Sequence, residues 1–116
     1  MRRVVITGIG ALTPIGKSHD AYVDALFEGK SGANRITHFD PTHFKTQFAC
    51  EVKDFDPQDY LDRREARRID PFVQYALVAA EEAMKDSGID AENINLDRAG
   101  VIWGSGIGGF YTIEHD

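Results

Sequence analysis

The stretch Asp70–Gly88, DPFVQYALVAAEEAMKDSG, decides the fold more than any other part of the sequence. Asp70 suits the N-cap of a helix, Pro71 its first turn and Gly88 its C-terminal end. Between these ends, apolar residues recur at helical spacing, and further apolar residues widen the apolar surface. The stretch therefore predicts a long helix that is buried on most of its faces.

Short β-branched runs lie on both sides of this helix in the sequence. Arg3–Thr7 and Ala99–Gly104 are typical of buried strands, and each leads into a glycine-rich loop. A helix is expected over His19–Glu28, and another begins near Phe110. The order strand, helix, long excursion, buried helix, strand and helix start predicts an α/β fold with a parallel sheet.

The intervening region holds weaker signals. Lys30–Lys45 has no clean period and is predicted as loop, Gln47–Val52 as a short strand, and Pro57–Leu61 as one helical turn. Two or three strands are too few for a parallel sheet that is covered on both faces. We therefore expect the 116 residues to be the front part of a larger fold that continues after Asp116.

Composition excludes several classes of protein. With 42% hydrophobic and 28% charged residues, the chain reads as globular, and no apolar run is long enough to span a bilayer. The net charge of -6 argues against a general nucleic-acid binder. Cys50 is the only cysteine, so no internal disulfide can form, and a reducing cytoplasm is expected.

The glycines of the second loop raise the question of nucleotide binding. Gly104, Gly106 and Gly109 fit the G-x-G-x-x-G spacing of dinucleotide-binding turns. The first glycine loop does not, because Thr13 stands where that spacing needs glycine. The alternative is a tight turn in which two backbones pass closely. The residues alone leave both interpretations open.

Four motifs in one order give a more specific indication. They are VVITGIGALTPIG at 4–16, GKSG at 29–32, RREARRIDPFVQYAL at 63–77 and GVIWGSGIGG at 100–109. Together they resemble the N-terminal part of the β-ketoacyl-acyl-carrier-protein synthases, most closely the synthase II group of bacterial fatty-acid elongation. The resemblance covers essentially the whole chain.

The resemblance implies a fold and a reaction. The fold would be thiolase-like, with five α-β-α-β-α layers when complete, and the enzyme a homodimer. The reaction would be a decarboxylating Claisen condensation of an acyl-enzyme thioester with malonyl-acyl-carrier protein. It needs no redox cofactor, nucleotide or metal. The nucleophilic cysteine and two histidines of the family are expected beyond residue 116, and Cys50 does not match the nucleophile.

The resemblance also assigns a role to the second glycine loop. The residue that matches Ile107 lines and gates the acyl pocket of the family. Gly106 and Gly108 on either side would allow the loop to move, and Phe110 would lie nearby. The glycines are then part of an acyl-pocket gate and not of a phosphate site.

A cluster of arginines in an acidic chain admits two interpretations. Arg63, Arg64, Arg67 and Arg68 form either a solvated helix edge or pairs with Asp62, Glu65 and Asp70, or else a docking patch for an acidic partner. The resemblance favours docking of acyl carrier protein at Arg64, Arg67 and Arg68, with Arg63 as a further candidate.

Other chemically suggestive residues are given ordinary roles. Cys50, beside the acidic Glu51, is expected to be packed and unreactive, and Asp20 and Asp24 to form a solvated helix face. The histidines lack zinc-ligand spacing and are expected on the surface; they are His19, His38, His43 and His115.

Three other functions stay open beside the elongating synthase. The first is a polyketide-type ketosynthase or a chain-length factor without the cysteine. The second is a non-enzymatic segment that binds carrier protein. The third is a nucleotide-dependent oxidoreductase, which would have to bind NAD.

Overall fold

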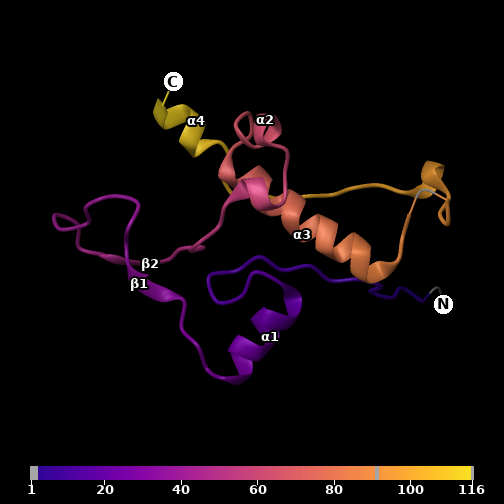
Figure 1. Ribbon diagram of the computed structural model, residues 1–116, viewed down its shortest axis with the longest axis horizontal. Coiled ribbons are helices and arrows are strands. Elements are labelled where there is room, and N and C mark those ends of the chain that lie inside the picture. Colours follow the sequence, from indigo (N-terminus) through magenta and orange to yellow (C-terminus); the bar gives the residue numbers. More distant parts are fainter. Residues whose placement is uncertain (1–2, 91, 116) are drawn as a thin grey trace. The chain divides into compact units, whose positions relative to one another are not determined.

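The computed structural model describes residues 3–90 and 92–115 (Figure 1). The chain divides into two compact units. The first unit comprises Met1–Gly10 and Asp56–Asp116, and the second Ala11–Phe55. The elements in chain order are α1 (His19–Phe27), β1 (Ala33–Arg35), β2 (Phe48–Cys50), the 3-10 turn η1 (Pro57–Asp59), α2 (Arg63–Ala66), α3 (Pro71–Ser87), the 3-10 turn η2 (Leu96–Arg98) and α4 (Phe110–His115).

The helix expected at the centre of the first unit forms as α3. Pro71 stands in its first turn, and Gly88 ends it in the left-handed conformation with φ 65°. Asp70 occupies the N-cap position, and its carbonyl accepts hydrogen bonds from the first-turn amides. Its carboxylate, however, makes no capping bond to the helix. The predicted boundaries are thus confirmed, and the Asp70 side chain is left for another partner.

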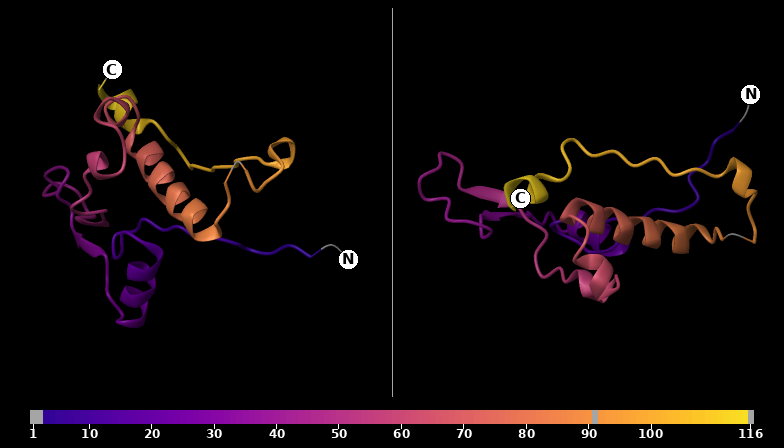
Figure 2. Two further views of the ribbon diagram at one scale, coloured as in Figure 1. Left: turned by 45° about the vertical axis from the view of Figure 1, so that its right-hand side comes forward. Right: turned by 90° about the horizontal axis from the view of Figure 1, so that it is seen from above.

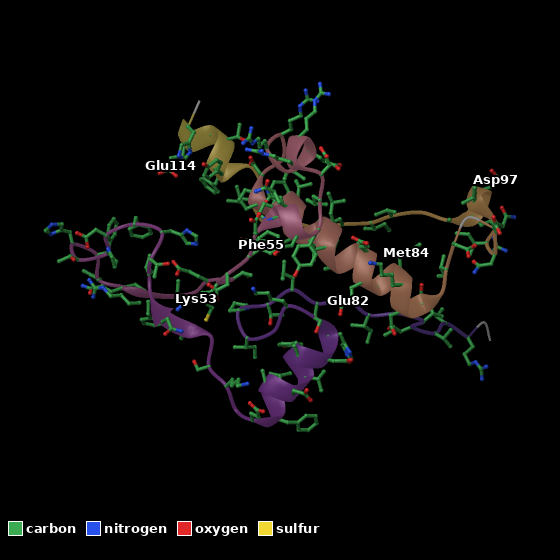
Figure 3. The ribbon with its side chains drawn as sticks, viewed as in Figure 1. Lys53, Phe55, Glu82, Met84, Asp97 and Glu114 are labelled. Atoms are coloured by element: carbon green, nitrogen blue, oxygen red, sulfur yellow. The ribbon has the colours of Figure 1, made fainter. Side chains whose placement is uncertain are left out.

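The prediction that this helix is buried on most faces was wrong. Val78 and Gln74, four residues apart on one face, are buried. Leu77 is 39% exposed and Met84, labelled in Figure 3, is 47% exposed. The physical reason is that the described residues of this unit cover only one side of α3.

The N-terminal segment packs against that helix through its glycines. A Cβ built on Gly10 would lie 1.9 Å from the carbonyl oxygen of Ala79, and one on Gly8 would lie 2.2 Å from that of Ala83. The Ile9 amide donates to Asp86 Oδ2 over 2.9 Å. Glycine is therefore required at Gly8 and Gly10 for the close approach of the two backbones.

The two strands predicted in this unit do not form. Residues 3–7 and 99–104 have no strand assignment, and the chain from η2 to α4 runs back without regular structure (Figures 1 and 2). Their apolar side chains are exposed to solvent: Val4 is 91% exposed and Ile102 is 98% exposed. A strand is held by hydrogen bonds to a neighbouring strand, and neither segment has one among the described residues.

In the second unit α1 forms as predicted. The Ser18 hydroxyl accepts from the Ala21 amide over 3.3 Å, and Gly29, with φ 68°, follows the end of the helix. Ala25 is 1% exposed, so it forms the buried contact of this helix. The predicted solvated face at Asp20 and Asp24 is confirmed, since both residues are exposed.

The sheet of the second unit is antiparallel and has two strands. β2 was predicted, whereas β1 lies inside the range predicted as loop, because pairing with β2 and not local periodicity holds it. Beyond the strands, Glu51 accepts hydrogen bonds from the Thr37 amide and hydroxyl at 2.9 and 2.8 Å. These bonds lower the pKa of the Glu51 carboxyl below its ordinary value.

Replacing Gly10 by alanine should destabilise the first unit. The new Cβ cannot fit against Ala79, so the N-terminal segment must move away from α3 at a cost of about 1–3 kcal/mol in unfolding free energy. The measurement is urea denaturation followed by circular dichroism. Gly100→Ala is the matched control, because a Cβ there meets nothing within 4 Å. Equal stability of the two variants would contradict the close approach.

Candidate functional site

The arginine cluster is carried by a short helix that one carboxylate caps. Asp62 Oδ1 accepts from the amides of Arg64 and Glu65 at 2.8 and 3.4 Å, which starts α2. Ala66 ends the helix and is 6% exposed, so the chain is fixed at this point. The arginines on both sides of Ala66 are thereby held outward.

All four arginines are exposed, as expected for a surface patch. They line an open hollow of about 570 Å³ together with Asp62, and Figure 3 shows nitrogen-tipped side chains extending from α2. In residues 3–90 and 92–115, none of the four makes an ion pair with Asp62, Glu65 or Asp70. The pairing alternative is therefore wrong, whereas the exposure of the arginines fits both a solvated helix edge and a docking patch for an acidic partner.

A buried amide ties the arginine segment to α3. Gln74 is 9% exposed, and its Nε2 donates to the carbonyls of Ala66 at 2.8 Å and Ile69 at 3.2 Å. Arg67 and Arg68 are the two residues between these carbonyls. The sequence analysis did not identify Gln74. The sequence feature that could have pointed to it is a single polar side chain four residues before the apolar Val78, on the same helix face.

The second glycine loop is open at one end and tightly seated at the other. Nothing lies within 4 Å of a Cβ built on Gly106, whereas one on Gly108 would meet the Phe72 ring at 2.6 Å. Ile107 is 71% exposed and Phe110 is 60% exposed. Gly106 therefore faces open space, and Gly108 lies in close contact with the Phe72 ring at the start of α3.

The loop leads into α4 beside Asp70. The Thr112 hydroxyl donates to Asp70 Oδ1 over 2.6 Å, and Gly109 takes a left-handed conformation with φ 76°. A second hollow, of about 440 Å³, is lined by residues on both sides of this contact: Ala66, Arg67, Arg68, Ile69, Asp70, Pro71, Gln74, Tyr111, Thr112 and His115. The arginine segment and the glycine loop thus meet at one end of α3.

This arrangement disfavours a phosphate at the glycine loop. In a dinucleotide-binding turn the pyrophosphate sits at the N-terminus of the helix that follows the glycines. Here the Asp70 carboxylate occupies the position at the N-terminus of α4 where a pyrophosphate would sit. Its Oδ2 lies 3.4 Å from a Cβ built on Gly109, and its Oδ1 accepts a hydrogen bond from the Thr112 hydroxyl. A carboxylate in this position repels an anionic ligand, so the nucleotide alternative loses its geometric support.

The remaining candidates are a possible nucleophile and possible metal ligands. Cys50 is an exposed free thiol on β2, so the expectation that it is packed was wrong: it lies in an edge-exposed two-stranded sheet. Among the described residues, no group of three or more histidine, cysteine or acidic side chains could hold a metal ion. Within the same residues, no helix has the length and apolarity that a membrane span requires.

Comparison with known proteins gives one consistent result. Residues 1–116 match the family model described as beta-ketoacyl synthase, N-terminal domain. Over 113 residues the chain is 48% identical to 3-oxoacyl-[acyl-carrier-protein] synthase 2 of Vibrio harveyi. The aligned residues make up 97% of this chain and 27% of that protein. The chain thus spans about a quarter of the length of this relative.

Solved structures show the same similarity. The ishigamide ketosynthase/chain length factor matches with a TM-score of 0.71 and 38% identity, over 80% of this chain and 23% of that one. A type II polyketide ketosynthase solved in complex with its acyl-carrier protein matches with a TM-score of 0.60 and 29% identity, over 82% of this chain and 23% of that one.

Replacing Gln74 by leucine should loosen the arginine segment. The carbonyls of Ala66 and Ile69 lose their shared donor, and leaving buried acceptors unpaired costs about 1–3 kcal/mol. Hydrogen exchange of the backbone amides of residues 63–70 should become faster, while that of the middle of α3 changes little.

The control for this change is Gln58→Leu, which removes the amide of an exposed glutamine in η1. It should leave exchange at residues 63–70 unaltered. If Gln74→Leu also leaves this exchange unaltered, the amide does not hold the segment.

Proposed function

The chain belongs to the β-ketoacyl synthase family, and from this membership we propose that it is part of an elongating 3-oxoacyl-[acyl-carrier-protein] synthase. The observation that carries the proposal is the match of residues 1–116 to the family's N-terminal domain. The similarity to a 3-oxoacyl-[acyl-carrier-protein] synthase 2 across 97% of the chain supports the choice of the fatty-acid elongation branch.

The proposed reaction forms one carbon–carbon bond and breaks another. An acyl group passes from carrier protein to an enzyme cysteine, with the carrier thiol as leaving group. Malonyl-carrier protein loses carbon dioxide, and the electron pair left on its C2 attacks the acyl-enzyme thioester. The cysteine thiolate leaves, and 3-oxoacyl-carrier protein is the product. No electrons enter or leave overall, so the reaction as written needs no redox cofactor or nucleotide.

The described site supplies recognition in this proposal, and the bond-making groups lie elsewhere. We place the nucleophilic cysteine and the two histidines beyond residue 116, because the chain spans 27% of its relative and Cys50 lies on an exposed strand. Residues 1–116 then form the N-terminal part of a ketosynthase domain. The single cysteine leads us to place the enzyme in the cytoplasm, and the family resemblance leads us to expect a homodimer.

The arginine patch is proposed to dock the acyl carrier protein. Arg63, Arg64, Arg67 and Arg68 form an exposed cationic surface in a chain whose net charge is -6. Such a patch attracts an acidic protein over long range and orients its approach. A structurally similar ketosynthase has been solved in complex with its acyl-carrier protein, which supports this class of partner.

The glycine loop is proposed to carry the acyl-pocket gate. Ile107 would set how long an acyl chain is accepted, Gly106 would permit the loop to move, Gly108 would seat it on Phe72, and Phe110 would border the pocket. The exposed apolar surface of Ile107 and Phe110 is what a hydrocarbon chain could cover.

A polyketide-type ketosynthase or chain-length factor is the second candidate, because two of the similar solved structures are of these kinds. Repeated condensation without intervening reduction would give poly-β-keto products and identify the former. A chain-length factor would form no acyl-enzyme. A single 3-oxoacyl product from one malonyl unit supports the elongating synthase.

Charge reversal at the arginine patch should weaken use of carrier-bound substrates. Condensation is measured in the protein that carries this sequence, with acyl-carrier and malonyl-carrier protein and with small thioester analogues. Arg67→Glu with Arg68→Glu should raise KM for the carrier-bound substrates about tenfold or more, equivalent to at least 1.4 kcal/mol of docking energy. KM for the small analogues should stay unchanged.

The matched control is Arg98→Glu, which reverses an exposed arginine of η2 in the same unit. It should alter neither KM. Equal loss of both substrate types in the patch variant would refute docking, and an unmodified protein without condensation activity would refute the proposed function.

Enlarging Ile107 should change acyl-chain selectivity. In Ile107→Phe the larger ring would fill the proposed gate, so kcat/KM for long acyl chains should fall about tenfold relative to short chains. Ile113→Phe makes the same change at a 70% exposed position on α4 and should leave the ratio as it was. An unchanged ratio in Ile107→Phe would remove Ile107 from the gate.

A further inference from the structure

Asp70 has a carboxylate whose partner lies far away in the sequence. It stands at the N-cap of α3, where such a side chain ordinarily accepts from the first-turn amides, but it makes no such bond. Instead Oδ1 accepts from the Thr112 hydroxyl at 2.6 Å, across 42 residues of sequence. A hydroxyl bonded to an ionised carboxylate is among the stronger hydrogen bonds of proteins.

This bond fixes one end of the glycine loop. Thr112 lies in the first turn of α4, and the carbonyl of Gly109 accepts from the Ile113 amide at 3.0 Å. Asp70 therefore holds the start of α4, and with it the loop residues directly before Gly109. At the other end of the loop, Gly104 and Gly106 meet nothing within 4 Å of a built Cβ. Ile107 lies between the free end and the fixed end.

The same turn of α3 also holds the arginine segment. Gln74 is four residues after Asp70, and its amide binds the carbonyls on either side of Arg67 and Arg68. The backbone carbonyl of Asp70 in turn accepts a hydrogen bond from the backbone amide of Gln74 at 3.2 Å. One helical turn thus supports both the patch proposed to dock the carrier protein and the loop proposed to gate the acyl pocket.

We propose that Asp70 is a positioning residue which, through its hydrogen bond to Thr112, sets the conformation of the Gly104–Gly109 loop and couples acyl-chain selectivity to carrier docking. The inference rests on the proposed function and deepens it. When a carrier protein binds Arg67 and Arg68, a shift of this segment displaces the first turn of α3 through the Gln74 hydrogen bonds. The Asp70–Thr112 hydrogen bond passes this displacement to α4. The loop that carries Ile107 then responds through its fixed end.

Thr112→Val tests the bond, because it removes the hydroxyl and preserves the shape of the side chain. The ratio of kcat/KM for long over short acyl chains is measured in the protein that carries this sequence, with carrier-bound and with small thioester substrates. The ratio should shift about tenfold with carrier-bound substrates, the equivalent of one lost hydrogen bond to a charged group, and clearly less with small thioesters.

Two variants separate this role from a general loss of structure. Thr112→Ser keeps the hydroxyl and should restore the ratio of the parent protein. Thr42→Val breaks a similar bond in the other unit, where the Thr42 hydroxyl donates to Asp40 Oδ1 at 2.5 Å, and should leave the ratio unaltered. Hydrogen exchange of the loop amides 104–108 should be faster in Thr112→Val and unaltered in Thr112→Ser.

The outcomes distinguish the inference from the function on which it rests. If Ile107→Phe shifts the ratio and Thr112→Val does not, Asp70 does not position the gate. An equal shift in Thr112→Val with both substrate types would overturn the coupling to docking. A parent protein that forms no 3-oxoacyl product would overturn the proposed function, and this inference with it.

Discussion

The hydrogen bonds at the first turn of α3 are the constraint on which the site depends. Gln74 is a buried polar residue of the first unit, and its side-chain amide satisfies two carbonyls of the segment that carries the arginines. An unpaired buried amide or carbonyl is costly, so this segment can take few other paths. Asp70, one turn earlier, extends the same support to α4 through Thr112.

The arginine patch follows from this support. Like charges placed close together repel one another, and the described carboxylates do not neutralise them: Asp62 caps α2, and Asp70 binds Thr112. Hydrogen bonds to the backbone of this segment, and not ion pairs, therefore hold the four arginines close together at the surface of an acidic chain. The positive charge of the arginine patch is therefore suited to attract an acidic protein. The charge of Lys85, by contrast, is paired with Glu81 on the same helix.

The fold class expected from the sequence motifs is confirmed by similarity to solved ketosynthases, although the two predicted parallel strands are absent from the described residues. The segments 3–7 and 99–104 have strand composition and strongly exposed apolar side chains. Composition makes a segment suitable for a sheet, but only hydrogen bonds to neighbouring strands make it a strand. The same reasoning explains β1, which forms without a periodic pattern because β2 pairs with it.

By itself the sequence determined the ends of α1 and α3, the position of β2, the glycine loop, the arginine cluster and the family. These features depend on caps, turn residues and short motifs, whose physical effects act over a few neighbouring residues. Only the tertiary structure decided that Asp70 binds Thr112, that Gly108 seats on Phe72 and that α3 is buried on one side. Such contacts join residues far apart along the chain, and the partner of a polar or apolar side chain is fixed by packing and not by its local sequence.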